Sequence, residues 1–148
     1  MYYIFFINNI ELVERVWTAE EIMKSLLEEN KWAFSAGAPN LKQLEKDDSV
    51  VVYLAGKGNR SFAADFTIAS KPYEAKLEPN EQDWLAMFPI RIEIKNIKLW
   101  TERLSIGNVI AQLEFIKDKK NYGLYFRQSI KVIEEKDFSV ILGGKKDT

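Results

Sequence analysis

A tryptophan followed by a loop of small residues is the stretch of this sequence best suited to specific chemistry. Residues 31–40 read KWAFSAGAPN, so Trp32 opens a short apolar run that ends in the loop 35–39. This loop has too little charge for an ordinary solvated loop and too much Gly and Pro for a helix. We expect it to let backbone approach a ligand beside an aromatic wall. The alternative, which composition alone favours, is that Trp32 is a core residue at the start of a strand.

The sequence contains neither histidine nor cysteine. Ser–His and Cys–His triads and the usual zinc sites are therefore excluded. An enzyme would have to use Lys, Tyr, a carboxylate-bound metal or carboxylates, and a hydrolase or transferase could use Asp65, Glu93 or Glu114. We expect instead a binding module that is not an enzyme and needs no cofactor or metal.

The charge of the chain is unevenly distributed. The net charge is −1, yet residues 1–90 carry 9 Lys or Arg against 14 Asp or Glu, and residues 91–132 carry 9 against 4. A basic segment on an acidic domain can steer a polyanion toward one face. The alternative is that these cations only solvate the outer surfaces of strands and helices.

Length and composition favour one globular domain, since the chain has 148 residues and 47% are apolar. We expect the domain to span residues 1–142, with 143–148 as a tail or linker. No apolar run is long enough to span a membrane, and the N-terminus lacks the features of a signal peptide. We therefore expect a cytoplasmic protein without a membrane partner.

Local patterns predict the elements that would position these residues. The apolar run 2–7 is typical of a buried strand that ends at the pair Asn8-Asn9. Thr18 and Glu21 match a capping box for a helix that runs to about Asn30. Further elements are expected at 49–55 and 62–70 (a hairpin joined by 56–60), at 88–100 (a long alternating strand with a bulge near Asn96), at 106–113 (a helix) and at 134–142 (a helix). This mixture without a βαβ rhythm predicts an α+β fold.

The order of several sequence blocks resembles the EVE domain family, which belongs with the YTH domains in a PUA-like superfamily. The blocks are YYIFFINN, Lys31-Trp32 with its small-residue loop, SVVVYLAG, FPIRIEIKNI, LEFIKDKKNYGLYFRQSI and EEKDF. They cover nearly the whole chain, roughly residues 2–142, and FIKDKKNYGLYFRQSI is the most characteristic. The resemblance implies a small curved β-barrel with flanking helices and a pocket at one end.

The same resemblance implies a function. In YTH domains the pocket holds one modified base extruded from a nucleic acid, so the expected partner is DNA or RNA with a modified base, such as N6-methyladenine or 5-methylcytosine. EVE-like and YTH-like domains also occur at the N-terminus of McrB-type modification-dependent restriction proteins. A fused GTPase domain and a nuclease subunit are therefore implied partners.

The resemblance also implies site residues, although the sequence departs from the YTH pattern at Ala33, where the family has a hydroxyl residue. Two aromatic walls are implied at Trp32 and Trp84, and base-edge contacts at Asn8 and Asn9. The complete implied set is Asn8, Asn9, Trp32, Ala33, Ser35, Trp84, Leu85 and Met87 for the base, and Lys119, Lys120 and Arg127 for phosphate. Two other functions stay open: a stand-alone reader of modified RNA, and a domain that binds a small ligand or a protein.

Overall fold

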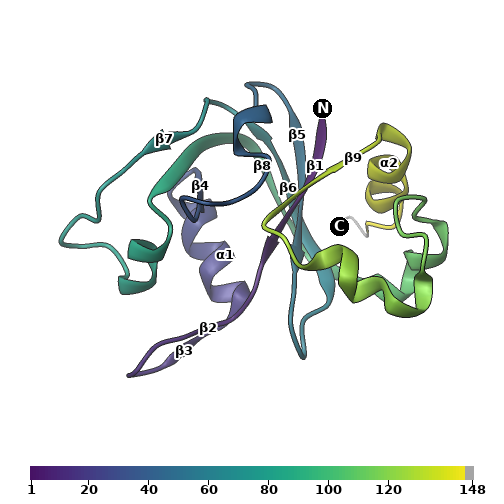
Figure 1. Ribbon diagram of the computed structural model, residues 1–148, viewed down its shortest axis with the longest axis horizontal. Coiled ribbons are helices and arrows are strands. Elements are labelled where there is room, and N and C mark those ends of the chain that lie inside the picture. The colour runs from purple at the N-terminus through teal and green to yellow at the C-terminus, as the bar shows by residue number, and fades with distance from the viewer. Residues whose placement is uncertain (146–148) are drawn as a thin grey trace.

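The computed structural model describes residues 1–145 (Figure 1). The strands are β1 (Tyr2–Ile7), β2 (Ile10–Glu11), β3 (Val16–Trp17), β4 (Lys31–Phe34), β5 (Ser49–Leu54), β6 (Ser61–Ile68), β7 (Tyr73–Glu74), β8 (Ile90–Ser105) and β9 (Ile130–Ile133). The α-helices are α1 (Ala19–Glu28) and α2 (Glu135–Gly143). Short 3-10 segments are η1 (Leu41–Gln43), η2 (Asp83–Met87), η3 (Ile106–Asn108), η4 (Ile110–Gln112) and η5 (Lys119–Phe126).

The main sheet is curled into half a barrel. Its strand order is β4-β8-β6-β5-β1-β9, with β7 paired to β8. β1 runs parallel to β5, whereas the other pairs of this sheet are antiparallel. A parallel pair needs a long crossover, and here the crossover contains α1 and β4. Figure 1 shows α1 on one side of the central strands and α2 on the other. The prediction of an α+β fold with a curved sheet and flanking helices is confirmed.

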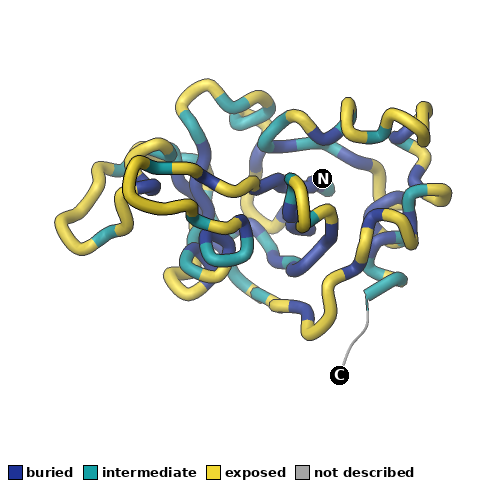
Figure 2. The backbone as a smooth tube through the Cα atoms, turned by 90° about the horizontal axis from the view of Figure 1, so that it is seen from below, coloured by how far each residue is buried: buried dark blue, intermediate teal, exposed yellow. Residues whose placement is uncertain are grey.

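Both faces of the central strands are buried, which explains why β1 is apolar at nearly every position. Tyr3 and Phe5 point into the cluster under α1, and Ile4 and Phe6 point into the cluster under α2. A strand covered on both faces is a continuous apolar run instead of an alternating one. Figure 2 shows the buried segments gathered in the interior, with exposed loops around them. The central strands are therefore packed on both faces, and the polar loops lie at their ends.

Helix α1 begins where the capping box predicts. The Thr18 hydroxyl accepts a hydrogen bond from the Glu21 N–H at 3.1 Å, and it also lies 3.2 Å from the Glu21 carboxylate. The helix ends at Glu28, slightly before the expected end, and Asn30 then has a left-handed φ of 56°. That conformation turns the chain directly into β4, which pairs with β8.

Strand β8 contains the predicted bulge and is longer than expected. Its pairing with β6 gains one residue between Lys95 and Lys98, where Asn96 has a φ of 54°. The strand continues to Ser105 because its second half pairs with the beginning of β6. Extra residues of this kind bend a strand and help a sheet to curl.

The prediction of a helix at residues 106–113 is wrong. The chain forms the short turns η3 and η4, separated by Val109 with a φ of −128°. Ile106, Val109 and Leu113 are nevertheless all buried in the cluster under α2. The apolar spacing that suggested a helix therefore reflects burial against the sheet, which periodicity alone does not distinguish from a helical stripe.

Helix α2 lies within one residue of its predicted range. It ends at Gly143, and the ammonium of Lys145 lies 3.3 Å from the Asp65 carboxylate on β6. The first residues of the expected tail 143–148 therefore contact the domain, while 146–148 lie outside the described residues. Among the described helices, none combines the length and apolar character needed to cross a membrane.

Candidate functional site

The end of β1 carries two adjacent asparagines, and one of them joins three segments of the chain. The Asn9 side-chain oxygen accepts hydrogen bonds from the Ala19 N–H at 2.8 Å and from the Asn59 amide at 3.1 Å. Two donors on this oxygen fix the orientation of the amide, so its NH2 group must point elsewhere. That NH2 group has no hydrogen-bond acceptor among residues 1–145. Asn9 therefore links the start of α1 to the β5–β6 loop and keeps a free donor.

Asn8 packs against the β5–β6 loop. Its side-chain oxygen accepts the Asn9 N–H at 2.8 Å. Gly56 has a φ of +96°, and a β-carbon there would lie only 2.3 Å from the Asn8 oxygen. Only glycine tolerates both the backbone conformation and this close approach. The Asn8 NH2 group also lacks an acceptor within the described chain, so both asparagines present free donors at the same end of the sheet.

A groove of about 460 Å³ opens beside these two side chains, and we call it the asparagine groove. Its apolar walls include Phe88, which leads into β8, and Phe126 at the end of η5. The ring of Phe88 packs edge to face on Trp84, with 6.2 Å between centroids. The full lining is Phe6, Ile7, Asn8, Asn9, Ile10, Ala55, Phe88, Phe126, Arg127, Gln128 and Ser129.

A second hollow of about 460 Å³, the cationic cavity, adjoins the asparagine groove. It lies between the β5–β6 loop and the 119–127 segment. Its cations are Arg60, Lys120 and Arg127, and its aromatic residues are Tyr53, Tyr122 and Phe126. The full lining is Asn8, Tyr53, Ala55, Gly56, Arg60, Lys120, Asn121, Tyr122, Gly123, Leu124, Phe126 and Arg127. Asn8, Ala55, Phe126 and Arg127 belong to both hollows, so the two adjoin, and we call them together the depression.

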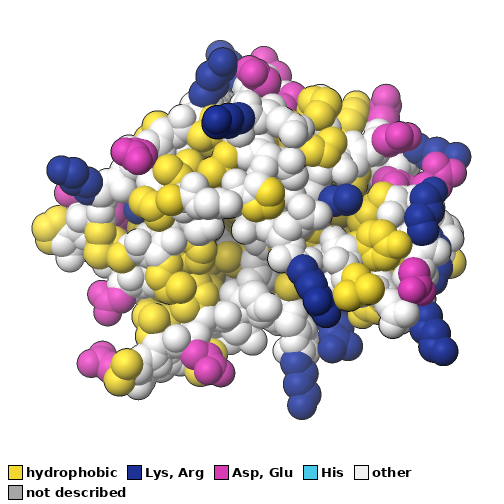
Figure 3. All heavy atoms as spheres, in the orientation of Figure 1, with side chains coloured by type: hydrophobic (Ala, Val, Ile, Leu, Met, Phe, Trp, Pro, Cys, Tyr) yellow, Lys and Arg dark blue, Asp and Glu magenta, His cyan; other side chains and the backbone are white. Residues whose placement is uncertain are grey.

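The charged side chains in the walls of this depression all have the same sign. Its walls contain cations and no carboxylate, whereas three other cavities within residues 1–145 each have at least two carboxylates in their walls. Figure 3 shows this face hollowed in its middle, with Lys and Arg side chains gathered at the lower right of the hollow. Uncompensated cations along a concave surface favour an anionic ligand. No three carboxylates within the described chain are grouped to hold a metal ion.

The cationic cavity offers a ligand a neutral hydrogen-bond donor, the Tyr53 hydroxyl, beside its positive charges. Burial raises the pKa of Tyr53, and the nearby Tyr122 adds to the effect, so this phenol stays protonated and can donate a hydrogen bond. The Tyr53 ring packs on Phe126 at 4.5 Å and on Phe62 at 5.0 Å. The floor of the cavity is therefore a packed aromatic cluster.

The three expected phosphate contacts occupy different positions. Lys120 and Arg127 line the cationic cavity, and Arg127 also lines the asparagine groove. The Lys119 ammonium instead donates to the carbonyls of Leu113 and Ile116, so it stabilises the preceding turn. The Asp118 carboxylate accepts from the Asn121 side chain at 2.9 Å and its N–H at 3.3 Å, and these bonds hold the pKa of Asp118 below its usual value.

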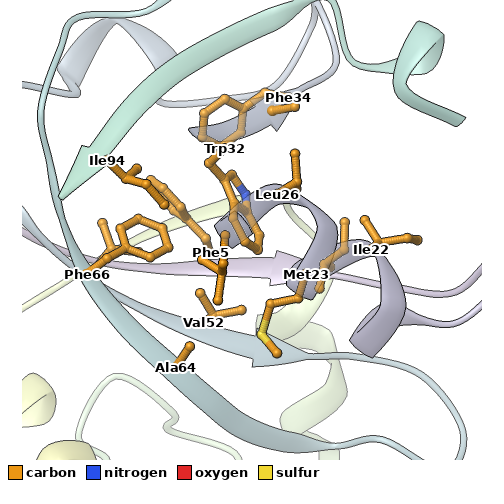
Figure 4. Packing of buried hydrophobic residues seen from close by; sticks show 14 of the residues in the cluster. Phe5, Ile22, Met23, Leu26, Trp32, Phe34, Val52, Ala64, Phe66 and Ile94 are labelled. Atoms are coloured by element: carbon orange, nitrogen blue, oxygen red, sulfur yellow. The ribbon is translucent and has the colours of Figure 1, made fainter. Parts of the chain in front are cut away.

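The first expected aromatic wall, Trp32, lies in the hydrophobic core. Its side chain is only 1% exposed and packs against Phe5 and Phe66, with ring centroids 6.2 and 5.6 Å away (Figure 4). The neighbouring Ala33 is also buried on β4, and Ser35 begins the turn that follows. None of these three residues lines either hollow. The structure thus has the core arrangement that composition favoured.

The second expected wall, Trp84, is also only 1% exposed. It lies on η2 with the buried Leu85, beside the end of α1, while Met87 points to solvent. The structure therefore brings Asn8, Asn9 and Arg127 together and separates them from both indole rings. Trp84 reaches the groove indirectly, because it supports the ring of Phe88.

Several residues of the depression were not expected from the sequence. Arg60 and Gly56 belong to a loop that reads as a simple hairpin turn, and Tyr53 reads as a packed strand residue. Tyr122 and Phe126 belong to the run NYGLYFRQ, whose aromatic and basic character was the one available signal. Nothing local distinguishes Phe88 from an ordinary strand residue.

Comparison with known proteins places this arrangement in a family. Residues 19–143 match the model of the EVE domain. A UPF0310 protein of Mycobacterium avium (strain 104) is 28% identical over 120 residues, which cover 76% of this chain and 81% of that protein.

Solved structures share the fold at low sequence identity. Human THYN1, crystallised in complex with 5-methylcytosine containing DNA, superposes with a TM-score of 0.63 at 12% identity over 99% of each chain. The N-terminal domain of Staphylothermus marinus McrB superposes with a TM-score of 0.52 at 9% identity, over 96% of this chain and 93% of that one. Because the family model spans most of the sequence, the chain belongs to the EVE domain family.

Proposed function

We propose that this domain binds DNA and recognises a methylated base that is extruded into the asparagine groove. One observation carries the proposal: two asparagines with free amide donors lie in a groove of about 460 Å³ with aromatic side walls and a cationic neighbour. The complex of human THYN1 with 5-methylcytosine containing DNA supports the choice of ligand. Binding of this kind needs no catalytic group.

The donors of the groove suit the edge of a base. The ring nitrogen and carbonyl oxygen on the pairing edge of 5-methylcytosine are hydrogen-bond acceptors. The NH2 groups of Asn8 and Asn9 are donors without a partner in the described chain. A flipped base loses its Watson–Crick partners and must have these bonds replaced by the protein.

The aromatic walls in this proposal are Phe88 and Phe126, which line the groove, and not the two tryptophans. Stacking a base on an aromatic ring contributes about 1–3 kcal/mol, and a methyl group gains further from apolar contact. Trp84 would act from beneath by holding Phe88 in place, and Trp32 by anchoring β4 in the core.

Phosphate contacts are proposed for Arg127 and Lys120. Both side chains line the depression, and neither pairs with a carboxylate of residues 1–145. Phosphate contacts position a nucleic acid and make its affinity fall with salt. Lys119 is left out of this set because its ammonium already binds two backbone carbonyls.

A role in a restriction system is a further part of the proposal. The likeness in fold to the N-terminal domain of S. marinus McrB supports a module that directs a GTPase and a nuclease to methylated DNA. The coding region beside the gene tests this directly. Genes for a GTPase and a nuclease there agree with it, and their absence contradicts it.

Fluorescence anisotropy with labelled oligonucleotides tests the base-reading proposal. Matched DNA strands would carry cytosine, 5-methylcytosine, adenine or N6-methyladenine, in single- and double-stranded form, at one fixed salt concentration, with the RNA equivalents beside them. We expect a methylated DNA to bind at least about tenfold more tightly than its unmodified partner, or about 1.4 kcal/mol. Equal affinities for all modified and unmodified strands overturn the proposal.

The variants Asn8→Ala and Phe88→Ala test whether the asparagine groove is the site that recognises the base. Each should reduce the preference for the methylated strand, since each removes a contact to the base and not to the backbone. Lys76→Ala is the matched control, because Lys76 is exposed and lies outside both hollows. It should leave the preference unchanged.

A further inference from the structure

The cationic cavity has features that the recognition of a single extruded base does not use. Its floor is Tyr53, which is buried and held by Phe126 and Phe62. Above the floor, the ring of Tyr122 touches Phe126 edge to face, with centroids 5.8 Å apart and planes inclined by 71°. Tyr122 is only half-buried, so part of this ring is left to the cavity.

The cations of this cavity come from two distant parts of the chain. Arg60 belongs to the β5–β6 loop, whereas Lys120 lies in η5 and Arg127 directly follows it. None of the three forms an ion pair with a carboxylate within residues 1–145, although Lys31, Arg91 and Lys95 elsewhere are paired. Unpaired cations around one cavity suit a phosphate bound inside it, because charge-assisted hydrogen bonds to phosphate are strong.

The position of the cavity relates it to the asparagine groove. Asn8 and Arg127 line both hollows, so a ligand that fills the groove contacts two residues that also line the cavity. A nucleic-acid strand continues on both sides of an extruded base. A neighbouring nucleotide that leaves the groove on the side of Arg127 reaches the cavity lined by Arg60 and Lys120.

We propose that the cationic cavity is a second nucleotide subsite, which binds the nucleotide next to the methylated base. Arg60 and Lys120 contact its phosphate, and its base stacks on Tyr122. This inference rests on the proposed function, because it takes the asparagine groove as the site of the extruded base. It makes the domain a reader of two adjacent nucleotides, with an affinity that depends on the neighbour as well as on the methyl group.

The test measures by anisotropy, at fixed salt, how tightly the wild type and each protein variant bind a set of single-stranded 9-mers, so that a change in the strand can be combined with a change in the protein. Each strand carries a central 5-methylcytosine or cytosine, and an abasic site replaces the nucleotide on its 5′ or its 3′ side. An abasic site on one side should weaken binding to the wild-type domain about tenfold, which is within the range of one lost base–aromatic stack. In Tyr122→Ala the same abasic site should have no further effect, whereas Tyr122→Phe should behave like the wild type.

The salt dependence of the affinity tests the phosphate contacts. Arg60→Ala and Lys120→Ala should each weaken methylated and unmodified strands equally, and should each reduce the slope of log affinity against log salt by about 0.7. Lys76→Ala should leave the slope unchanged. The mononucleotide 5-methyl-dCMP, which has no neighbour, should bind the wild type and Tyr122→Ala equally well, and this separates a flanking nucleotide from a free phosphate ligand.

The outcomes separate the two proposals. The subsite is overturned if the abasic site and Tyr122→Ala each weaken binding and their effects on the binding free energy add. It is also overturned if both Arg60→Ala and Lys120→Ala leave the salt slope unchanged. Either result counts even if the domain still recognises methylation. Equal binding of methylated and unmodified strands overturns the proposed base reading, while the same combinations on the unmodified strands still test the subsite. Absence of binding to every oligonucleotide overturns both.

Discussion

Asn8 and Gly56 approach each other so closely that a β-carbon at position 56 would lie 2.3 Å from the Asn8 side-chain oxygen. The contact joins the end of β1 to the β5–β6 loop at the point where the two hollows meet. The position of one proposed base contact is therefore set by a glycine that lies 48 residues later in the chain.

This contact predicts different effects for two nearby glycines. Gly56→Ala and Gly58→Ala should both lose about 1–2 kcal/mol of unfolding free energy, since φ is +96° and +86° at these positions. Only Gly56→Ala should also displace Asn8 and lower the affinity for methylated DNA, because a β-carbon at position 58 meets nothing within 4 Å. Urea unfolding and anisotropy measure the two effects. Equal binding by both variants would argue against Asn8 as a base contact.

The Asn9 side chain has two roles that substitution can distinguish. Its oxygen is a structural acceptor, and its NH2 group is the proposed donor to the ligand. Asn9→Asp keeps an oxygen for the Ala19 N–H at the start of α1, where a negative charge is favourable, so stability should change by less than about 1 kcal/mol. The same change removes the NH2 donor and adds a negative charge, so affinity for DNA should fall about tenfold or more. Asn9→Ala should cost about 1 kcal/mol of stability, because the Ala19 N–H loses its acceptor. Unimpaired DNA binding by Asn9→Asp would exclude the amide donor from the site.

Trp32 and Phe88 should respond differently to truncation. Trp32 is 1% exposed, so Trp32→Ala should lower the unfolding free energy by about 3–5 kcal/mol, and any loss of binding should follow the loss of folded protein. Phe88 is only half-buried, so Phe88→Ala should cost less stability and still impair recognition of the methylated base. Thermal unfolding followed by circular dichroism, with anisotropy on the folded fraction, compares the two. A Trp32→Ala protein of wild-type stability that no longer distinguishes methylated DNA would restore Trp32 as a cage wall.

Glu81 predicts how stability depends on pH. Its carboxylate lies 3.1 Å from the Lys31 ammonium and 3.4 Å from the Arg91 guanidinium. Burial opposes ionisation, but the Glu78 N–H and these two cations outweigh it and lower the pKa of Glu81 below its ordinary value. A carboxylate with a lowered folded-state pKa stabilises the fold above its unfolded-state pKa, and this stability is lost as pH falls through the folded-state value.

Glu81→Gln should therefore be less stable than the wild type at neutral pH and should approach it as the solution is acidified below about pH 4.5. Urea unfolding of both proteins at about pH 7 and about pH 3 measures the change in their difference. A difference that stays constant with pH would mean that ionisation of Glu81 does not contribute to stability.

Local patterns in the sequence were sufficient for much of the fold. The range of β1, the cap of α1 at Thr18 and the bulge at Asn96 all depend on neighbouring residues, because propensity, capping and alternation act over a few positions. The lack of histidine and cysteine likewise limits the chemistry of the chain whatever its fold, since no arrangement can supply an imidazole or a thiol. The helix expected at residues 106–113 failed because apolar spacing reports burial and not backbone conformation.

The candidate site depended on tertiary structure. Asn8, Asn9 and Arg127 could be named from the sequence, and the fold brings them to one depression. Which aromatic rings accompany them could not be predicted from local sequence, because Trp32 is buried in the core while Tyr53, Phe88 and Phe126, which line the two hollows, come from distant parts of the chain. By itself the sequence determined most of the elements and the polar ends of the strands. Only the curl and register of the sheet decided which side chains are buried and which line the two hollows, since those contacts join residues far apart in sequence.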